Sequence, residues 1–286
     1  MEWQKTDIGP GLYLVSTPIG AARDITLRAL DVLASVDVLA AEDTRTLRHL
    51  MEIHGVALGG RQVIAYHDHN GPKMRPRLLG LLAEGRSVAY ASEAGTPLVA
   101  DPGFVLAREA ISAGAPVIAV PGASAVLAAL TVAGLPTDRF LFAGFAPSTG
   151  AARRRFLQEV TAIPATLVLY ESPKRVRELF TDLVQICGSD RRAALCRELT
   201  KRFEEVMRGT LAEVSARLAE AEPRGEVVVV LDRAGEGAVT EADVEAALKA
   251  ALATMSVKDA AQAVSQALGL TRREVYQVAL KLAGGK

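Results

Sequence analysis

Three short loops rich in glycine and proline carry the residues of this chain best suited to hold a ligand. Each follows a short apolar run that predicts a buried strand: Pro18–Gly20, Gly95–Pro97 and Pro121–Gly122. Glycine lets a ligand approach the backbone closely, and proline stops the loop from continuing as strand or helix. No loop matches a dinucleotide fingerprint or a P-loop. If the three loops line one site, its walls consist of backbone, which suits a flat, largely uncharged ligand better than a polyphosphate.

The middle loop belongs to the stretch VAYASEAGTPLVADPG, residues 88–103. Its apolar start predicts a strand over Val88–Ala91, which a polar turn at Ser92–Pro97 ends. A second turn at Asp101–Gly103 leads into a helical pattern from Phe104. Open α/β sheets bind ligands at the carboxyl ends of their strands. An ordinary strand-to-helix connection has the same composition and remains an alternative.

The first part of the chain, residues 1–134, alternates strand and helix about five times. The predicted strands are 12–16, 36–41, 63–66, 88–91 and 116–120. This alternation predicts a mostly parallel sheet with helices on both faces. Because the carboxyl ends of parallel strands share one edge, we expect the three loops to meet there.

A second α/β domain is predicted over residues 135–234, after a linker-like segment. Its predicted strands are 140–143, 165–170, 193–197, 203–208 and 227–232, with helices near 151–162, 173–187 and 210–221. Thr210 and Glu213 form a capping-box pattern. Between Phe145 and Thr210 the chain carries twelve Lys or Arg against eight Asp or Glu. The run Arg153–Arg155 is suited to grip phosphate, although a solvated face is equally consistent with it.

The last part, residues 235–286, is predicted to be a helical extension after a turn-rich linker at 235–240. Its helical patterns cover 256–268 and 271–282 and are separated by a turn at 269–270, as in a helix-turn-helix. Arg272 and Arg273 open the second helix, which meets nucleic acid in such motifs. A small bundle that packs on the protein or on a partner explains the pattern equally well.

The composition narrows the class of protein. Half of the 286 residues are hydrophobic, yet no apolar run approaches the roughly 20 residues of a membrane span. No secretory signal is evident either. We therefore expect a cytoplasmic protein. The net charge of +0 argues against an indiscriminate nucleic-acid coat. Cys187 and Cys196 lack metal-like spacing and are expected to be reduced. The run His67–Asn70 offers at most two adjacent imidazoles, so we expect no metal.

Eight segments, taken in order, resemble the ribosomal RNA small-subunit methyltransferase I family. They are LYLVSTPIGAARDITLRAL, AAEDTR, HDHN, SEAGTPLVADPG, PGASA, GLPTDRFLFAGFAP, YESPKR and RELTKRFEE, within about residues 11–232. That family belongs to the tetrapyrrole-methylase-like class of S-adenosylmethionine enzymes. The resemblance implies two α/β domains with a cofactor cleft between them, a helical C-terminal extension and a homodimer. It also implies 2′-O-methylation of a cytidine in the decoding region of small-subunit rRNA, within the 30S particle.

The resemblance further implies a site for S-adenosylmethionine built from strand ends of both domains. The residues carried over are Pro18, Gly20, Gly95, Thr96, Val99, Ser124 and Ala125 from the first domain, and Tyr170 and Glu198 from the second. The chain departs from the family pattern at Ser16, Ala21 and Glu93. The longer Glu93 side chain shifts the reach of its carboxylate, which puts any role of that carboxylate in doubt.

Methyl transfer to a ribose hydroxyl requires that the hydroxyl lose or share its proton. The candidates for this step are two carboxylate–ammonium pairs at predicted strand ends, Glu171 with Lys174 and Glu198 with Lys201. A carboxylate acts as a base directly, and a lysine does so when its pKa is lowered. The same pairs could equally be structural salt bridges. Further candidates for substrate contacts are Asp43, Arg45, His67 and His69.

Two other functions remain open at this point. A methyltransferase of the same fold that acts on a tetrapyrrole carbon would need no RNA-binding face. A ligand-sensing helix-turn-helix regulator would need the tail to dominate nucleic-acid binding. The tail carries six basic and six acidic residues, which disfavours the regulator.

Overall fold

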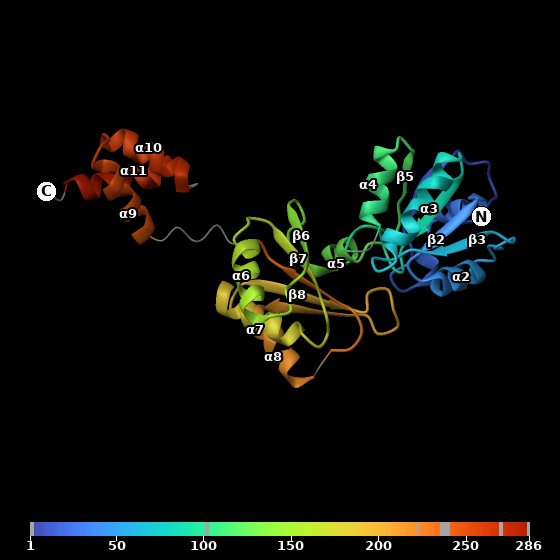
Figure 1. Ribbon diagram of the computed structural model, residues 1–286. Helices are drawn as coiled ribbons and strands as arrows, with labels where there is room; N and C mark the ends of the chain where they lie inside the picture. The colour runs from blue at the N-terminus through green and yellow to red at the C-terminus, as the bar shows by residue number, and fades with distance from the viewer. Residues whose placement is uncertain (1–2, 101–102, 222, 235–240, 269–270, 285–286) are drawn as a thin grey trace. The chain divides into compact units, whose positions relative to one another are not determined.

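The structure is a computed structural model that describes residues 3–100, 103–221, 223–234, 241–268 and 271–284. The chain forms two compact units, Met1–Arg233 and Ala234–Lys286. The first unit contains two β-sheets with their helices, and the second contains helices (Figure 1). In the described part of the chain, no helix has the length and apolar character needed to cross a membrane.

The first sheet consists of parallel strands in the order β3-β2-β4-β1-β5. The strands are β1 (Gly11–Val15), β2 (Val38–Ala41), β3 (Gln62–Ala65), β4 (Ser87–Ala91) and β5 (Val117–Val120). The predicted parallel sheet is therefore confirmed. Every residue of β2 and β4 is buried, as expected for short apolar runs in a sheet covered on both faces.

Helices cover both faces of the first sheet. On one face lie α1 (Leu27–Ser35) and α2 (Thr44–Ile53), whose Leu33 and Met51 pack with Leu39 of β2. On the other lie α3 (Gly71–Ala83) and α4 (Phe104–Ser112), whose Leu78 and Leu106 pack around Tyr90 of β4. A 3-10 turn, η1 (Ala22–Asp24), precedes α1.

The second sheet is mixed, with the strand order β6-β7-β10-β8-β9. Its strands are β6 (Phe140–Phe145), β7 (Thr166–Glu171), β8 (Arg192–Arg197), β9 (Glu205–Thr210) and β10 (Val227–Leu231). β6 runs parallel to β7, whereas β10 runs antiparallel to both β7 and β8. Because β10 begins where β7 and β8 end, the start of β10 lies between their carboxyl ends at one edge of the sheet.

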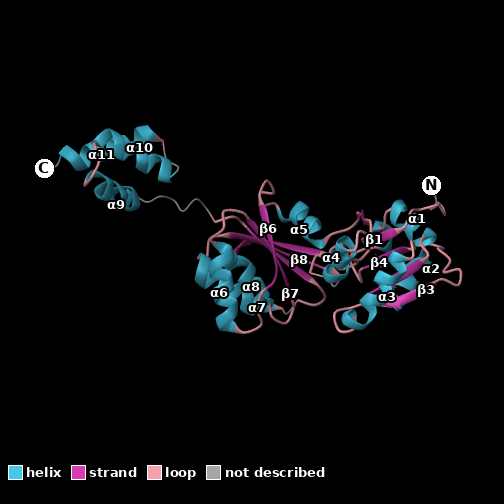
Figure 2. Cartoon of the chain, turned by 45° about the horizontal axis from the view of Figure 1, so that its top comes forward, coloured by secondary structure: helices cyan, strands magenta, loops and turns pink. Residues whose placement is uncertain are grey.

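One face of the second sheet is covered by α6 (Gly150–Thr161), α7 (Val176–Cys187) and α8 (Leu211–Glu220) (Figure 2). The capping box predicted from Thr210 and Glu213 is confirmed. The strand predicted over 203–208 begins two residues later, at Glu205, because Glu205 pairs with Arg197, the last residue of β8, and Phe203 stays in the preceding loop.

The other face of the second sheet is covered by α5 (Ala125–Ala133), which follows the last strand of the first sheet. Leu130 of α5 shares an apolar cluster with Val168 and Cys196 of the second sheet. Helix α5 thus joins the two sheets within one unit. Burial raises the pKa of the Cys196 thiol to about 11, and both cysteines are free.

The second unit contains α9 (Glu241–Leu252), α10 (Val257–Leu268) and α11 (Arg272–Gly284). Leu248, Ala261 and Val275 belong to its own apolar core. The two helices predicted in this part are confirmed. The predicted linker at 235–240, the turn at 269–270 and the Asp101–Pro102 part of the earlier turn lie outside the described residues.

Candidate cofactor and substrate site

The three glycine- and proline-rich loops are hydrogen-bonded to one another at the carboxyl edge of the first sheet. Thr17 N–H donates to Gly95 O (2.9 Å), and Gly95 N–H donates back to Thr17 O (3.0 Å). The hydroxyl of Thr96 donates to Ala123 O at 3.0 Å, which ties the middle loop to the third. The expectation that the loops after β1, β4 and β5 meet is therefore confirmed.

Buried hydroxyl groups fix the same loops internally. Thr17 Oγ1 donates to Ser92 O at 3.2 Å, and Ser92 Oγ donates to Gly95 O at 2.7 Å. Ser16, Thr17 and Ser92 are all less than 5% exposed. Because the hydroxyls of Thr17 and Ser92 satisfy backbone carbonyls of the loops, these loops are held together without charged side chains.

Two glycines of these loops occupy positions that a larger residue would disturb. Gly95 has φ +81°, and a Cβ there would lie 3.3 Å from Ile19 Cγ2. A Cβ on Gly122 would lie 2.9 Å from Ser16 Cβ. Leu98 and Ala100 also have positive φ, so the middle loop holds a backbone conformation that side-chain-bearing residues rarely adopt.

The remaining candidates of the first domain lie around the same edge. Val99 and Ala125 are partly buried against the apolar cluster of α5. Ser124 is the N-cap residue of α5, and its hydroxyl makes no capping hydrogen bond. All seven residues carried over from the first domain therefore belong to loops, or to the start of α5, that meet at this edge of the first sheet.

The first loop is also in contact with a loop of the second domain, the segment 198–201. A Cβ on Gly20 would lie 2.5 Å from Lys201 Cγ and 2.6 Å from Thr200 Oγ1. Ala21 N–H donates to Thr200 Oγ1 at 3.1 Å. Glu198 (φ +51°) and Thr200 (φ +63°) both adopt the left-handed conformation. This strained backbone conformation occurs where loops of the two sheets meet.

Lys201 lies between two carboxylates at this junction. Its Nζ is 2.9 Å from Glu198 Oε1 and 2.8 Å from Glu226 Oε2. The backbone N–H of Glu226 also donates to Glu198 Oε1 and, with Lys201, lowers the pKa of Glu198. Burial alone would lower the pKa of Lys201, but its bonds to Glu226 and Glu198 raise it. Lys201 is thus held as an ammonium and lacks the lowered pKa that a lysine base requires.

The other pair expected from the sequence does not form. Glu171 has a fully buried side chain whose Oε1 pairs with Arg175 and accepts the N–H of Ser172 at 2.7 Å. Lys174 is exposed and makes none of the ion pairs found in the described part of the chain. In β7, Leu169 faces the helix-covered side and Tyr170 faces α5, so Glu171, next after Tyr170, falls on the helix-covered side.

The arginine run Arg153–Arg155 does not act as a unit. Arg153 is buried, with Nε 2.7 Å from Asp182 and Nη1 3.0 Å from Glu178. Arg154 Nη1 lies 3.5 Å from Asp182 Oδ1. Of the three arginines, only Arg155 is exposed and makes no ion pair in the described part of the chain. The expected phosphate grip by all three is therefore wrong. Arg153 lies four residues before buried Leu157, a spacing that places both on the packed face of α6.

The further candidates lie at the ends of β2 and β3. Asp43 caps α2, and its hydrogen bonds from Arg45 lower the pKa of its carboxyl to about 2. His67 and His69 contact each other with ring centroids 6.0 Å apart. In the parts of the chain that are described, no three potential metal ligands lie together.

Glu42 was not singled out from the sequence. Burial raises the pKa of its carboxyl, and the charges of Glu93 and Asp68 raise it further. These three carboxylates follow β2, β4 and β3 and so share the loop-bearing edge. The position of Glu42 directly after the buried run of β2 was the available signal.

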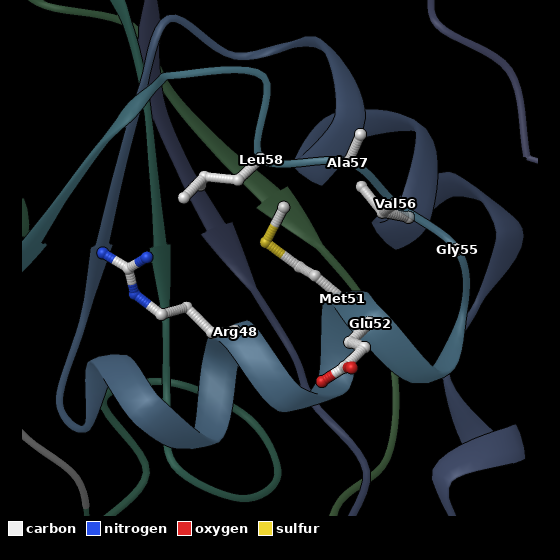
Figure 3. A pocket seen from close by; sticks show the side chains of 7 residues that line it. All are labelled: Arg48, Met51, Glu52, Gly55, Val56, Ala57 and Leu58. Carbon is white, nitrogen blue, oxygen red and sulfur yellow. The ribbon is translucent and has the colours of Figure 1, made fainter.

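A separate hollow of about 390 Å³ lies at the other end of the first sheet. Figure 3 shows its lining, in which Met51 points toward Leu58. Helix α2 starts at the carboxyl end of β2 and runs back, so its last turn and residues 55–58 lie away from the three loops.

The fold is that of a known class of enzymes. The chain matches a cobalt precorrin-4 methyltransferase with TM-score 0.58 and 17% identity, over 77% of this chain and 94% of the other. It matches a Thermus thermophilus uroporphyrin-III C-methyltransferase, solved with S-adenosylhomocysteine, with TM-score 0.54 and 21% identity, over 78% and 97%. The profile of the Tetrapyrrole (Corrin/Porphyrin) Methylases covers residues 11–215. The two-sheet fold predicted from the resemblance is therefore confirmed.

Relatives of higher sequence identity show to which family of this methylase class the chain belongs. The Mesorhizobium japonicum protein named ribosomal RNA small subunit methyltransferase I is 45% identical over 274 residues, covering 96% of this chain and 92% of the relative. Residues 238–283 match the RsmI C-terminal HTH domain. The chain belongs to the ribosomal RNA small subunit methyltransferase I family.

Proposed function

We propose that this protein transfers the methyl group of S-adenosylmethionine to the ribose 2′-oxygen of a cytidine in the decoding region of small-subunit rRNA. The observation that carries the proposal is the close-packed wall of three loops, joined by the Thr17–Gly95 bridge and by Thr96. The name of the 45% identical relative supports rRNA as the substrate. The neighbour solved with S-adenosylhomocysteine, the spent form of this cofactor, supports the choice of methyl donor.

The proposed cofactor residues are those of the loop wall together with one residue of the second domain. They are Pro18, Gly20, Gly95, Thr96, Val99, Ser124, Ala125 and Tyr170. The fit rests on the close packing of the loops, because a Cβ on Gly95 or Gly122 would press on Ile19 or Ser16 and push the loops apart. S-adenosylmethionine supplies an activated methyl group when bound. The loops orient it and exclude water, which is the main contribution a protein makes to such a displacement.

For the acceptor hydroxyl, the geometry favours Glu198 and Lys201 over Glu171 and Lys174. Glu198 and Lys201 lie in the loop that contacts Gly20. Glu198 Oε1 already accepts hydrogen bonds from Lys201 and from the Glu226 N–H, which leaves Oε2 to accept a hydrogen bond from the hydroxyl. Because the pKa of Glu198 is lowered, the carboxylate takes the proton only as the new O–CH3 bond makes the hydroxyl strongly acidic. The charged Lys201 stabilises negative charge on the attacking oxygen. Glu171, on the helix-covered face and paired with Arg175, serves a structural role instead.

We also propose that the enzyme is a cytoplasmic homodimer that acts on the 30S particle. Light scattering of the purified protein tests the dimer. Methylation of 30S particles compared with free rRNA tests the preferred substrate, and a higher rate on free rRNA would contradict this part of the proposal.

The experiment that tests the reaction is to map the transferred methyl group. The protein is incubated with deuterated-methyl S-adenosylmethionine and unmodified 30S particles, and the rRNA nucleosides are separated by mass spectrometry. We expect label in 2′-O-methylcytidine. Label on a base, or no transfer to RNA together with transfer to a tetrapyrrole, would contradict the proposal.

A further inference from the structure

A β-bulge near the end of β6 changes the direction in which Phe145 points. Phe142 pairs with Val168 of β7, and the next pair is Phe145 with Tyr170, so β6 has one extra residue between the two pairs. Gly144 within the bulge has φ +68°. A glycine in this conformation allows such an insertion, and bulges recur next to active sites, where they re-aim a side chain.

The bulge brings Phe145 to the face of the sheet that is turned toward α5. Phe142 and Tyr170 belong to the apolar cluster of α5, whereas Leu141 and Ala143 pack on the opposite, helix-covered face. With regular alternation Phe145 would join the second group. Instead its ring lies 5.6 Å from that of Tyr170, at an interplanar angle of 67°.

Phe145 remains 54% exposed although its ring reaches this aromatic cluster. Tyr170 also contacts Phe142, with ring centroids 4.8 Å apart, so Phe145 extends a supported row of rings outward. The 67° angle makes its contact with Tyr170 edge-to-face rather than stacked. The ring is thus rigidly backed and accessible at the carboxyl end of β6.

We propose that Phe145 is a stacking platform for the base of the acceptor nucleotide, extruded from its neighbours in the rRNA. The proposal rests on the proposed function and adds how the substrate is held. Proteins that recognise single-stranded RNA commonly stack its unstacked bases on aromatic rings, and a base held in this way fixes the position of the ribose 2′-hydroxyl attached to it. Because every base has a π-face, the ring orients the nucleotide and does not by itself select cytosine.

Charge at the same edge agrees with RNA as the occupant. β7 is the neighbour of β6, and the loop after it carries Lys174, which is exposed and free of ion pairs in the described part of the chain. Because β6 and β7 are parallel, Phe145 at the end of β6 and Lys174 after the end of β7 belong to the same edge of the sheet, where the ammonium can bind a phosphate of the same RNA strand. A cofactor base is the competing occupant, and the experiment separates the two.

The test is steady-state methylation of unmodified 30S particles by wild-type protein and by Phe145→Ala, Phe145→Leu and Phe145→Trp. Loss of one base–aromatic stack should lower kcat/KM for the particles about 5- to 100-fold in the Ala and Leu variants. The KM for S-adenosylmethionine should stay within about twofold, and Trp should restore most of the rate. Phe140→Ala is the matched control, because Phe140 is also exposed but lies at the opposite end of β6.

Three results would overturn the inference. A Leu variant as active as wild type would mean that only apolar cover is needed. A raised KM for S-adenosylmethionine with unchanged kcat/KM for the particles would place the ring against the cofactor. An Ala variant equal to wild type would remove the platform altogether. If wild-type protein itself methylates no rRNA, the proposed function fails as well. Thermal melting of each variant identifies misfolding, and Leu then carries the comparison if Ala does not fold.

Discussion

The two sheet edges that bear the candidate residues are built in different ways. At the edge of the first sheet, backbone hydrogen bonds and buried hydroxyls join three loops, as in the Thr17–Gly95 bridge. At the edge of the second sheet, side chains dominate: Lys201 bridges Glu198 and Glu226, and the rings of Tyr170 and Phe145 pack together.

This difference indicates a division of labour. A wall of backbone has a fixed shape and little charge, which suits a small cofactor that must be held in one pose. Charged and aromatic side chains suit proton transfer and contact with RNA, and Tyr170 is the one residue of this edge that we also propose for the cofactor. Many charges of the second domain, however, are already paired with each other, so net positive charge alone overstates how much of it is available to RNA.

The largest expected effect tests whether the arginines of the second domain are paired within the protein instead of being available to RNA. Arg153→Ala leaves the buried Asp182 without its main partner, and we expect the free energy of unfolding to fall by about 3 kcal/mol. Arg155→Ala is the control and should change it by less than about 0.5 kcal/mol. Urea denaturation measures both. If Arg153→Ala folds as stably as wild type but binds rRNA more weakly, Arg153 faces RNA after all.

The next effect tests the backbone wall. Gly95→Ala places a Cβ on a φ of +81° beside Ile19, and we expect the KM for S-adenosylmethionine to rise about tenfold because the loop must shift. Gly85→Ala is the matched control, since Gly85 has φ +75° with no atom within 4 Å of the added Cβ. It should cost about 1 kcal/mol of stability without changing that KM. Equal effects of the two variants on KM would mean that the loop has no special role.

A moderate effect is expected from the charged junction. Lys201→Met leaves two carboxylates without their cation and should cost about 1 kcal/mol of stability at pH 7, whereas Lys201→Arg should cost less. The pKa of Glu198 is lowered, so its contribution is present above its ordinary value of 4.5 and is lost as the pH falls through the lowered pKa.

The pKa of Lys201 is raised, so its contribution is present below 10.5 and is lost as the pH rises through the raised pKa. The stability difference between wild type and Lys201→Met should therefore be flat between about pH 5 and 10. Denaturation across this range measures it. A step near pH 7 to 8 would show that Lys201 titrates there and acts as a lysine base.

The smallest effect concerns Glu42. Its raised pKa means that the folded protein holds the charged form poorly, so stability falls as the pH rises from 4.5 through the raised pKa. Glu42→Gln should therefore stabilise the protein at pH 7 by about 0.5 kcal/mol at most, and not below pH 4. Thermal melting at both values measures this. Destabilisation at pH 7 would show that the carboxylate is needed in its charged form.

The sequence predicted the first edge better than the second. Buried strands in a parallel sheet read as continuous apolar runs, so their ends, and the meeting of the loops at Gly20, Gly95 and Gly122, follow from the pattern. The second edge depends on partners distant in sequence, such as Glu226 with Lys201. The spacing of residues shows neither that contact nor the fact that Glu171 pairs with Arg175 instead of Lys174.

The bulge at Gly144 illustrates the same limit. One inserted residue turns Phe145 to the other face, and strand periodicity assigns that face wrongly unless the pairing with β7 is known. The only local signal was Gly144, which directly follows the strand predicted over 140–143.

The division of labour is tested most directly by titrating S-adenosylhomocysteine into wild-type protein, Gly95→Ala and Phe145→Ala in one calorimetric series. We predict a Kd raised about tenfold for Gly95→Ala and unchanged within about twofold for Phe145→Ala, because we propose the first residue for the cofactor wall and the second for contact with RNA. A Kd raised equally by Phe145→Ala, or left unchanged by Gly95→Ala, would contradict this account.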